Sequence, residues 1–229
     1  MNILVINGSP KGENSTTLKL TKAFLAGIDS DESHLIDIIT VTTAHIEPCR
    51  GCFCCMAKGV CAFKDDMQAF LKKYLAADVV IWSFPLYFYS MPSKIKTFLD
   101  RLLPIYLPYI VTTVDGRVEH PTRYDIERQK HILISTCGFY NIQGNYDALL
   151  KQVEILFGKR FISILCPEGY LFDVHIMQKR TGRYLSYIQK AGEEYFTQGY
   201  FSEFTQTKLN ELLCPSDLFI EMTNSGWMK

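Results

Sequence analysis

The sequence predicts an α/β protein with a doubly wound parallel sheet of five strands, and three observations support this class. Five short apolar runs are present, and segments with the apolar spacing of a helix separate them. The 229 residues correspond to one enlarged domain. The composition, with 48% hydrophobic and 21% charged residues, is that of an ordinary globular protein. Strands that alternate with helices form a parallel sheet that the helices cover on both faces.

The first predicted strand, 2–6, is an apolar run that ends in a turn of Asn, Gly, Ser and Pro. Serine and threonine residues then open a helix over 15–28, in which apolar side chains return at helical spacing. The next apolar run predicts a second strand over 35–39. The cysteine-rich segment that follows shows no clear periodicity, so we expect a loop there.

A helix over 65–75 begins with two aspartates, which suit the positive end of a helix. The third strand, 79–84, stops at a proline. The helix over 91–103 carries Pro92 near its first turn, where proline is tolerated. The same reasoning completes the pattern with strands over 131–135 and 161–166 and helices over 144–157 and 177–195.

Right-handed crossover connections leave the strand order 2-1-3-4-5 as the simplest arrangement, which is a flavodoxin-like sheet. We expect this domain to cover residues 1–199. Two segments lie outside this pattern of strands and helices. The first is an insertion over 104–130 with a predicted hairpin turn at 114–118. The second is a C-terminal helical extension over 200–229, with short helices expected over 202–213 and 216–223.

Charge and composition exclude several classes of function. The 24 Lys and Arg residues balance the 24 Asp and Glu residues, so neither a nucleic acid nor an anionic membrane is expected as a partner. No apolar stretch is long enough to cross a bilayer, and the N-terminus lacks the features of a secretory signal. We therefore expect a cytoplasmic protein. Five of its eight cysteines fall within thirteen residues, and in a reducing compartment such a cluster indicates metal ligation or redox chemistry.

The loop after the first strand has the features of a phosphate site. Ligands of such a sheet bind at the carboxyl ends of its strands, where the strand order reverses. Hydroxyls at Ser9, Ser15, Thr16 and Thr17, together with free backbone amides at a helix start, are what a phosphate monoester requires. The sequence patterns of nucleoside triphosphatases and of dinucleotide sites are missing. The alternative is that Ser15 and Thr16 only cap the helix.

Two further loops are expected to meet the first one. The loop after the third strand, 83–92, is rich in aromatic residues, which suit a flat heteroaromatic ring. The alternative for this loop is a proline-bounded turn whose aromatic side chains lie in the core. The loop after the fourth strand, 135–140, supplies a glycine, where the edge of a ring could approach the backbone.

These motifs resemble the NAD(P)H-dependent FMN reductase and flavodoxin-like superfamily over roughly residues 1–166. The resemblance rests on the Gly-Ser-Pro-Lys of the first loop with its Asn-Ser-Thr, and on Pro-Leu-Tyr at 85–87 leading to the run 96–101. It implies that FMN places its phosphate on Ser9, Ser15, Thr16 and Thr17, with Lys11 as a further contact. It implies that the isoalloxazine ring lies against the second and third loops, at Pro85, Leu86, Tyr87, Phe88, Tyr89, Ser90, Thr136, Cys137, Gly138 and Phe139. Lys96, Asp100 and Arg101 match the family pattern, and we interpret them as ion-pairing residues that hold their helix.

Four of the clustered cysteines, Cys49, Cys52, Cys55 and Cys61, have the spacing C-x2-C-x2-C-x5-C. This spacing and the Asp-Asp-Met that follows resemble the cluster motif of the iron–sulfur flavoproteins, a branch of the same superfamily. Four thiolates in one flexible loop can surround a 4Fe–4S cube. The resemblance implies a cluster that exchanges single electrons with the flavin. Free thiols, structural zinc and disulfides stay open as alternatives, and Cys54 is an extra thiol that the pattern does not need.

We therefore expect an FMN-dependent oxidoreductase that takes hydride from NAD(P)H and passes electrons to a quinone, a flavin, a nitro compound or an iron–sulfur centre. No side-chain acid or base is essential for this chemistry, and we name no catalytic residue. The resemblance also implies a homodimer whose second chain helps to wall the flavin pocket, with 104–130 as a dimer arm or a substrate lid. Two alternatives stay open: a non-enzymatic electron carrier, and a redox sensor that uses the cysteine loop.

Overall fold

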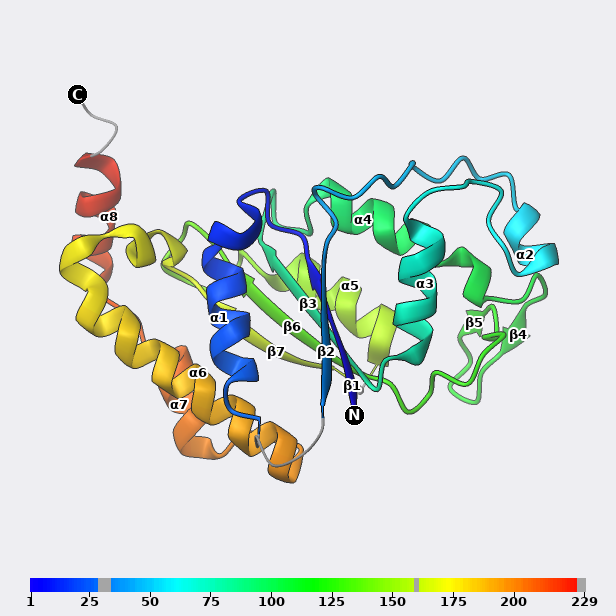
Figure 1. The fold of residues 1–229 in the computed structure, drawn as a ribbon. Helices are drawn as coiled ribbons and strands as arrows, with labels where there is room; N and C mark the ends of the chain where they lie inside the picture. The colour runs from blue at the N-terminus through cyan, green and yellow to red at the C-terminus, as the bar shows by residue number, and fades with distance from the viewer. Residues whose placement is uncertain (29–33, 159–160, 226–229) are drawn as a thin grey trace.

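Figure 1 shows the computed structural model, which describes residues 1–28, 34–158 and 161–225, as a twisted sheet with helices on both faces. The five core strands are parallel, and their spatial order is β2-β1-β3-β6-β7. Numbered by the core strands alone, this order is 2-1-3-4-5, so the predicted flavodoxin-like sheet is confirmed. The strands are β1 (Asn2–Asn7), β2 (Leu35–Thr40), β3 (Val79–Pro85), β6 (Lys130–Thr136) and β7 (Phe161–Cys166).

The two faces of the sheet carry separate apolar layers. Side chains alternate along β1, so that Leu4 and Ile6 enter one layer while Ile3 and Val5 enter the other. Burial on both faces explains why the strands read as nearly continuous apolar runs. One layer is covered by α3 (Met67–Ala76), α4 (Ser93–Asp100) and α5 (Asp147–Phe157). The other is covered by α1 (Thr16–Leu25), α6 (Gln178–Gln198), α7 (Glu203–Asn210) and α8 (Ser216–Ser225).

Helices α1 and α6 approach each other closely because glycines face each other between them. A Cβ atom built on Gly192 would lie 1.9 Å from the carbonyl oxygen of Phe24, and one on Gly27 would lie 2.1 Å from that of Gln189. Any side chain at either position would push the two helices apart. This contact fixes the orientation of α1, whose first turn borders the site described below.

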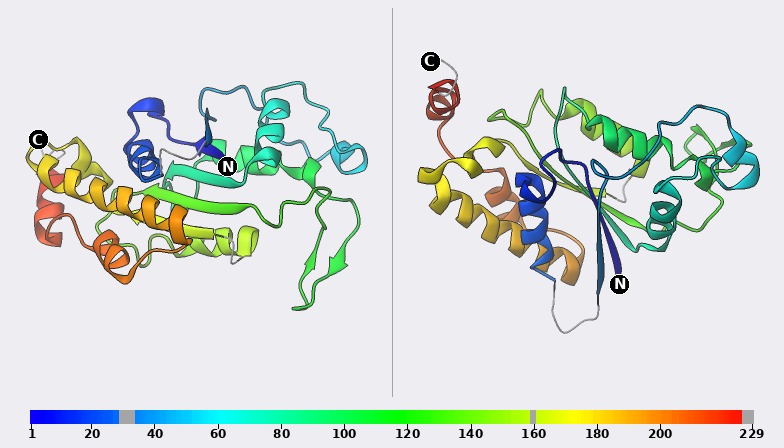
Figure 2. Two further views of the ribbon diagram at one scale, coloured as in Figure 1. Left: turned by 60° about the horizontal axis from the view of Figure 1, so that its bottom comes forward. Right: turned by 45° about the horizontal axis from the view of Figure 1, so that its top comes forward.

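The segments beyond the core sheet also take the predicted forms. The hairpin in the insertion consists of β4 (Val111–Thr112) and β5 (Val118–Glu119), which pair in antiparallel fashion around a turn with Gly116 at φ +81°. Figure 2 shows that this hairpin projects from the sheet as an arm. Both predicted C-terminal helices are present as α7 and α8. The division into a domain over 1–199 and an extension over 200–229 stays a prediction, and 226–229 lie outside the described residues.

One expectation about secondary structure was wrong. The cysteine segment is not entirely a loop, because α2 (Cys54–Lys58) forms within it. Five residues are too few to show a helical period in the sequence. Phe53 and Gly59, both in the left-handed region, flank this helix, and the Gly59 amide donates to the Cys55 carbonyl at 2.7 Å.

Short 3-10 turns complete the described chain, over Gly12–Asn14, Leu103–Ile105, Gly169–Asp173 and His175–Met177. None of the helices in the described ranges combines the length and the apolar character that a membrane span needs.

Candidate functional site

A cavity of about 250 Å³ opens at the carboxyl edge of the sheet, beside the N-terminus of α1 at the upper edge of the sheet in Figure 1. Four loops form it, those after β1, β3, β6 and β7. Eleven of the fifteen residues expected to contact FMN line this cavity. The three loops that were predicted to meet therefore do so here. The lining residues are Ser9, Lys11, Ser15, Thr16, Thr17, Pro85, Leu86, Tyr87, Thr136, Cys137, Gly138, Gly169, Tyr170 and Asp173.

The loop after β1 is held by hydrogen bonds between its own residues. The Ser9 amide donates to Asn7 Oδ1 at 3.2 Å, and the Lys11 amide donates to Ser9 Oγ at 3.3 Å. Gly8 packs on α4 so tightly that a Cβ atom there would lie 2.3 Å from Ile95 Cγ1. The loop is therefore fixed against the helix before any ligand binds.

The hydroxyls of this loop do not all face the cavity in the same way. Ser15 Oγ accepts from the Leu18 amide at 3.2 Å, so Ser15 caps α1 as well as lining the cavity. Thr17 Oγ1 and Thr136 Oγ1 are hydrogen bonded to each other at 2.7 Å and are buried. The first turn of α1 leaves N–H groups without partners in the helix, and it carries partial positive charge. The N-terminus of α1 can therefore attract an anion.

One ion pair crosses the mouth of the cavity. Lys11 Nζ lies 3.0 Å from Asp173 Oδ2, and both side chains are at least half exposed. Such an exposed pair adds little stability. The pair does hold the Lys11 side chain at the mouth of the cavity.

The loop after β3 makes a tight turn with backbone strain. Tyr87 and Ser90 exchange two backbone hydrogen bonds of 3.0 Å, while Phe88 and Tyr89 have φ angles of +47° and +62°. Such conformations cost non-glycine residues about 1–3 kcal/mol each. The turn directs Phe88 into solvent, where it is 99% exposed, and stacks Tyr89 on Phe139 with ring centroids 6.3 Å apart. Phe88, Tyr89, Ser90 and Phe139, which we expected at the ring, do not line the cavity, and their contact with the ring stays a prediction.

The loop after β7 supplies three lining residues that sequence reasoning missed: Gly169, Tyr170 and Asp173. A signal for them existed, because the carboxyl end of β7 meets the same edge as those of the other parallel strands. The Gly169 amide donates to the Cys137 carbonyl at 2.9 Å, which joins this loop to the loop after β6. Burial raises the pKa of the Cys137 thiol, so this thiol is neutral at pH 7.

A second cavity, of about 20 Å³, lies at the cysteine segment. Its lining includes all four cysteines expected as ligands and excludes Cys54, the extra thiol. Among the described residues, no group of three or more His, Cys, Asp or Glu side chains is arranged as a metal site. The four cysteines, Cys49, Cys52, Cys55 and Cys61, thus share one cavity without a preformed ligand geometry.

Arg101, which lines the cysteine cavity, forms a buried ion pair with Asp65. Arg101 donates from Nη1 to Asp65 Oδ2 at 2.7 Å and from Nη2 to Asp65 Oδ1 at 2.9 Å, and both side chains are 1% exposed. Burial raises the pKa of Asp65, but the Arg101 guanidinium and the Glu47 and Met67 amides together outweigh burial and hold that pKa below its ordinary value. Arg101 therefore joins the end of α4 to the cysteine segment, while Lys96 and Asp100 pair with each other on the surface of the helix.

The cysteine cavity has a cationic lining. Arg101 lines it, and Arg101 Nε is buried with no hydrogen-bond partner in the described part of the chain. The ring of Phe63 lies under two guanidinium groups, 4.4 Å from that of Arg50 and 4.8 Å from that of Arg101. Burial raises the pKa of Cys55, and the nearby Cys61 raises it further. The Arg101 Nε–H group would stabilise a negative charge in this cavity, and a metal ion bound there would lower the pKa of the crowded thiols.

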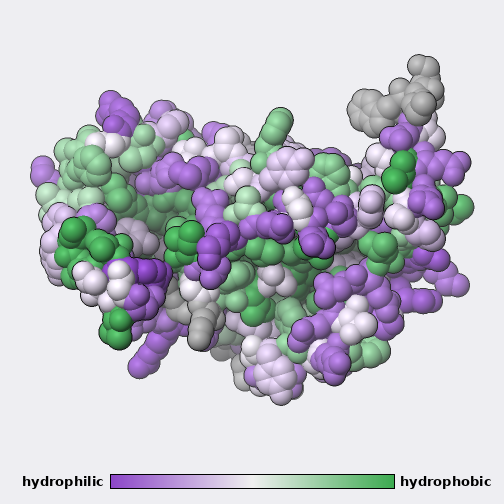
Figure 3. All heavy atoms as spheres, turned by 180° about the vertical axis from the view of Figure 1, so that it is seen from behind, coloured by the Kyte–Doolittle hydropathy of each residue, from purple (hydrophilic) through white to green (hydrophobic). Residues whose placement is uncertain are grey.

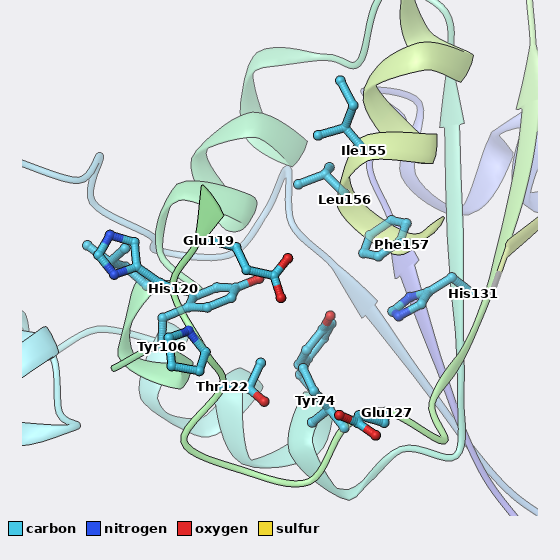
Figure 4. A pocket seen from close by; sticks show the side chains of 13 residues that line it. Tyr74, Tyr106, Glu119, His120, Thr122, Glu127, His131, Ile155, Leu156 and Phe157 are labelled. Carbon is cyan, nitrogen blue, oxygen red and sulfur yellow. The ribbon is translucent and has the colours of Figure 1, made fainter. Parts of the chain in front are cut away.

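A third cavity, of about 610 Å³, lies at the opposite edge of the sheet, between the arm and the ends of α3 and α5. Figure 4 shows Tyr74, His131 and Phe157 on one side of it and Glu119 and His120 on the other. The rings of His131 and Phe157 are stacked at 3.8 Å. No sequence pattern pointed to this cavity, and we assign no ligand to it.

Comparison with known proteins is consistent with this architecture. Residues 1–164 match the sequence model of a protein family whose description is 'flavodoxin-like fold'. An iron–sulfur flavoprotein of Archaeoglobus fulgidus is 33% identical over 190 residues, which are 80% of this chain and 83% of that protein. An FMN-dependent NADH:quinone oxidoreductase of Sinorhizobium fredii is 31% identical over 187 residues, 74% of this chain and 86% of that protein.

Other similarities are shorter or more distant. An iron–sulfur flavoprotein of Methanocaldococcus jannaschii is 33% identical over 105 residues, 46% of this chain, and the match spans about half of that relative, 53%. Among solved structures, an FMN-dependent NADH-azoreductase of Bacillus anthracis in complex with FMN has a TM-score of 0.61 at 17% identity, over 87% of this chain and 99% of that one. At that identity, the likeness concerns the fold.

Proposed function

The chain belongs to the family with the flavodoxin-like fold, and from this premise we propose that it is an FMN-dependent oxidoreductase that takes hydride from NADH or NADPH. The observation that carries the proposal is the cavity of about 250 Å³, which gathers eleven predicted residues from three loops far apart in sequence. The names of the Sinorhizobium relative and of the Bacillus structure, both FMN-dependent, support the choice of cofactor.

The residues of the cavity fit FMN in two parts. Ser9, Ser15 and Thr16, with the N-terminus of α1 and Lys11, would hold the phosphate. Thr17 would act through Thr136, since their hydroxyls are bonded to each other. The segments Pro85–Tyr87 and Thr136–Gly138 would flank the ring.

Gly138 leaves room for the edge of that ring, because a Cβ atom there would meet no atom within 4 Å. FMN, when bound, supplies the hydride and electron chemistry, and the chain supplies binding and orientation.

The surroundings of the cavity suit small aromatic acceptors. Tyr87, Phe88, Tyr89, Phe139 and Tyr170 are all exposed around its mouth. Aromatic faces stack on flat rings, so we propose a quinone, a free flavin or a nitro compound as the electron acceptor. An iron–sulfur centre is a further proposed acceptor. None of these steps needs an acid or a base from the chain.

We also propose that the protein is a homodimer that uses its arm. Apolar side chains gather at the end of the molecule that carries the hairpin (Figure 3). Tyr109, Ile110, Val114 and Val118 are exposed there, and exposed apolar patches mark interaction sites. The arm would then wall the pocket of a second copy or close over a substrate.

For the cysteine cavity we propose a 4Fe–4S cluster held by Cys49, Cys52, Cys55 and Cys61. The exclusion of Cys54 from the cavity supports four thiolates as the ligands. The Arg101 Nε–H group supports the proposal as well, because a cluster together with its four thiolates carries a net negative charge. The relatives named iron–sulfur flavoproteins support the choice of iron. When bound, a cluster of this kind supplies single-electron transfer. None of the eight cysteines, all within the described residues, forms a disulfide, which supports a reducing compartment and thus a cytoplasmic location.

Anaerobic spectroscopy of the purified protein tests the oxidoreductase proposal. We expect the flavin band to bleach when NADH or NADPH is added without oxygen. A flavin band that does not respond would indicate an electron carrier. Apoprotein that takes up no FMN in a titration would overturn the proposal.

The cluster proposal has its own test, with a matched control. C49A and C61A should lose the broad visible shoulder of a cluster, and C54A should retain it. Retention in all three variants would overturn the ligand assignment. Bound zinc without iron, or metal-free protein with reactive thiols, would favour the redox-sensor alternative.

A further inference from the structure

Glu168 occupies an unusual position beside the flavin cavity. It follows β7 by two residues and precedes Gly169, which lines the cavity. Its side chain is buried, at 1% exposure, and its φ angle is +62°. A non-glycine residue keeps such a conformation only where its surroundings determine it.

The carboxylate of Glu168 holds a turn of the C-terminal extension. Oε2 accepts from the Leu213 amide at 2.6 Å, and Oε1 accepts from the Cys214 amide at 3.2 Å. The Cys214 thiol lies 3.5 Å from Oε1. Arg180 in α6 donates to the Leu213 carbonyl at 2.7 Å and so holds the same turn. The link therefore joins residues 45 positions apart in the sequence.

The backbone of Glu168 holds the wall of the cavity. Its amide donates to the Phe139 carbonyl at 2.6 Å, and the next amide, of Gly169, donates to the Cys137 carbonyl at 2.9 Å. A Cβ atom on Gly169 would lie 3.0 Å from Thr136 Cβ, so the two loops have little room to slide. One residue thus connects the loops after β6 and β7 to the C-terminal extension.

We propose that Glu168 is a positioning residue through which docking of the turn at Leu213 and Cys214 controls retention of FMN, an inference that rests on the proposed function. A buried carboxylate without donors is costly. When the turn detaches, Glu168 moves toward water and carries Gly169 and Tyr170 away from the cavity. The coupling is reciprocal, so bound FMN holds the turn in place.

A pair of glutamate variants tests this coupling. E168Q replaces one of the two acceptor oxygens with an NH2 group, which cannot accept from the Leu213 or the Cys214 amide. E194Q is the matched control, because Glu194 in α6 holds the same extension at another place, accepting from the Ser202 amide at 2.8 Å and from Thr205 Oγ1 at 2.9 Å. Glu194 does not line the flavin cavity. We expect the FMN dissociation constant, measured by flavin fluorescence quenching on apoprotein, to rise roughly tenfold in E168Q and to stay unchanged in E194Q.

Hydrogen exchange of the wild-type protein gives a second measurement that needs no variant. The amides of Leu213 and Cys214 should exchange more slowly with saturating FMN than without it, whereas the amides of Ser202 and Thr205 should not respond. An equal change of FMN affinity in E168Q and E194Q would overturn the coupling. Amide exchange at Leu213 and Cys214 that is the same with and without FMN would also overturn it. Wild-type protein that binds no FMN at all would instead overturn the proposed function on which the inference rests.

Discussion

The ion pair between Arg101 and Asp65 predicts a large loss of stability when either partner is removed. Both side chains are 1% exposed, and the guanidinium donates to both carboxylate oxygens. Removing one partner of a buried pair costs about 3–5 kcal/mol, because the other charge stays buried without compensation. We expect the free energy of unfolding of R101Q and of D65N to fall by amounts in this range.

The two variants leave different partners behind. In R101Q, the Asp65 carboxylate still accepts from the Glu47 amide at 2.9 Å and from the Met67 amide at 3.2 Å. In D65N, the guanidinium still donates to the Glu47 carbonyl at 2.6 Å. Because each single variant loses the same pair, the R101Q/D65N double variant should cost less than the sum of the two, by about 1–3 kcal/mol.

Urea unfolding of metal-free protein at pH 7, followed by circular dichroism, measures these differences. A loss of about 4 kcal/mol corresponds to a fall in Tm of roughly 10 °C for a chain of this size. D100N is the matched control: Asp100 pairs with Lys96 on the surface of the same helix, and such a pair contributes less than about 1 kcal/mol. Single variants as stable as D100N, or strictly additive losses in the double variant, would refute the reasoning.

Acid unfolding provides an independent check on the same pair. The folded-state pKa of Asp65 lies below its ordinary value. Its contribution is therefore present above the unfolded pKa, near 4, and is lost as the pH falls through the folded pKa. Wild-type protein should lose stability in this range, and D65N should lose less.

Three further predictions concern glycine contacts, backbone strain and a buried carboxylate. G192A should lose about 1–3 kcal/mol of unfolding free energy, measured in urea, because the new Cβ would lie 1.9 Å from the Phe24 carbonyl oxygen. Its control is G182A on the same helix, which has open space around it and should gain up to about 1 kcal/mol. F88G should gain about 1 kcal/mol, since it relieves a φ of +47° and loses no packing at 99% exposure; a loss measured by the same assay would contradict the strain. Burial raises the folded-state pKa of Glu168, so wild-type stability should decline relative to E168Q as the pH rises from 4.5 through that pKa, and parallel pH profiles would refute this.

Much of the fold could be predicted because the sheet is buried on both faces. Residues 79–82 form one apolar run, since their side chains enter both layers. The short helix α2 could not be predicted in this way. It contains five residues, and it begins after Phe53 in a left-handed conformation that no residue type announces.

The candidate site was predictable where it depends on local sequence. The hydroxyl-rich loop after β1 lies next to the helix that it caps, so residues 9–17 could be assigned together. Phe88 and Tyr89 lie outside the cavity because positive φ angles turn them away from it, and φ cannot be read from aromatic residues. Their contact with the ring stays a prediction. Glu168 could not be found from the sequence, since its partners Leu213 and Cys214 reach it only through the packing of α6 and α7.

Helix α4 relates the two cavities to each other, although they share no lining residue. Ile95 in its first turn packs against Gly8 of the loop after β1, and Arg101, directly after its last residue, lines the cysteine cavity. A helix of eight residues spans about 12 Å and is stiff. Its two ends are fixed, one by the lack of space at Gly8 and the other by the ion pair with Asp65. The loop after β1 and the cysteine segment are therefore held by opposite ends of the same helix, so α4 sets the separation of the two cavities.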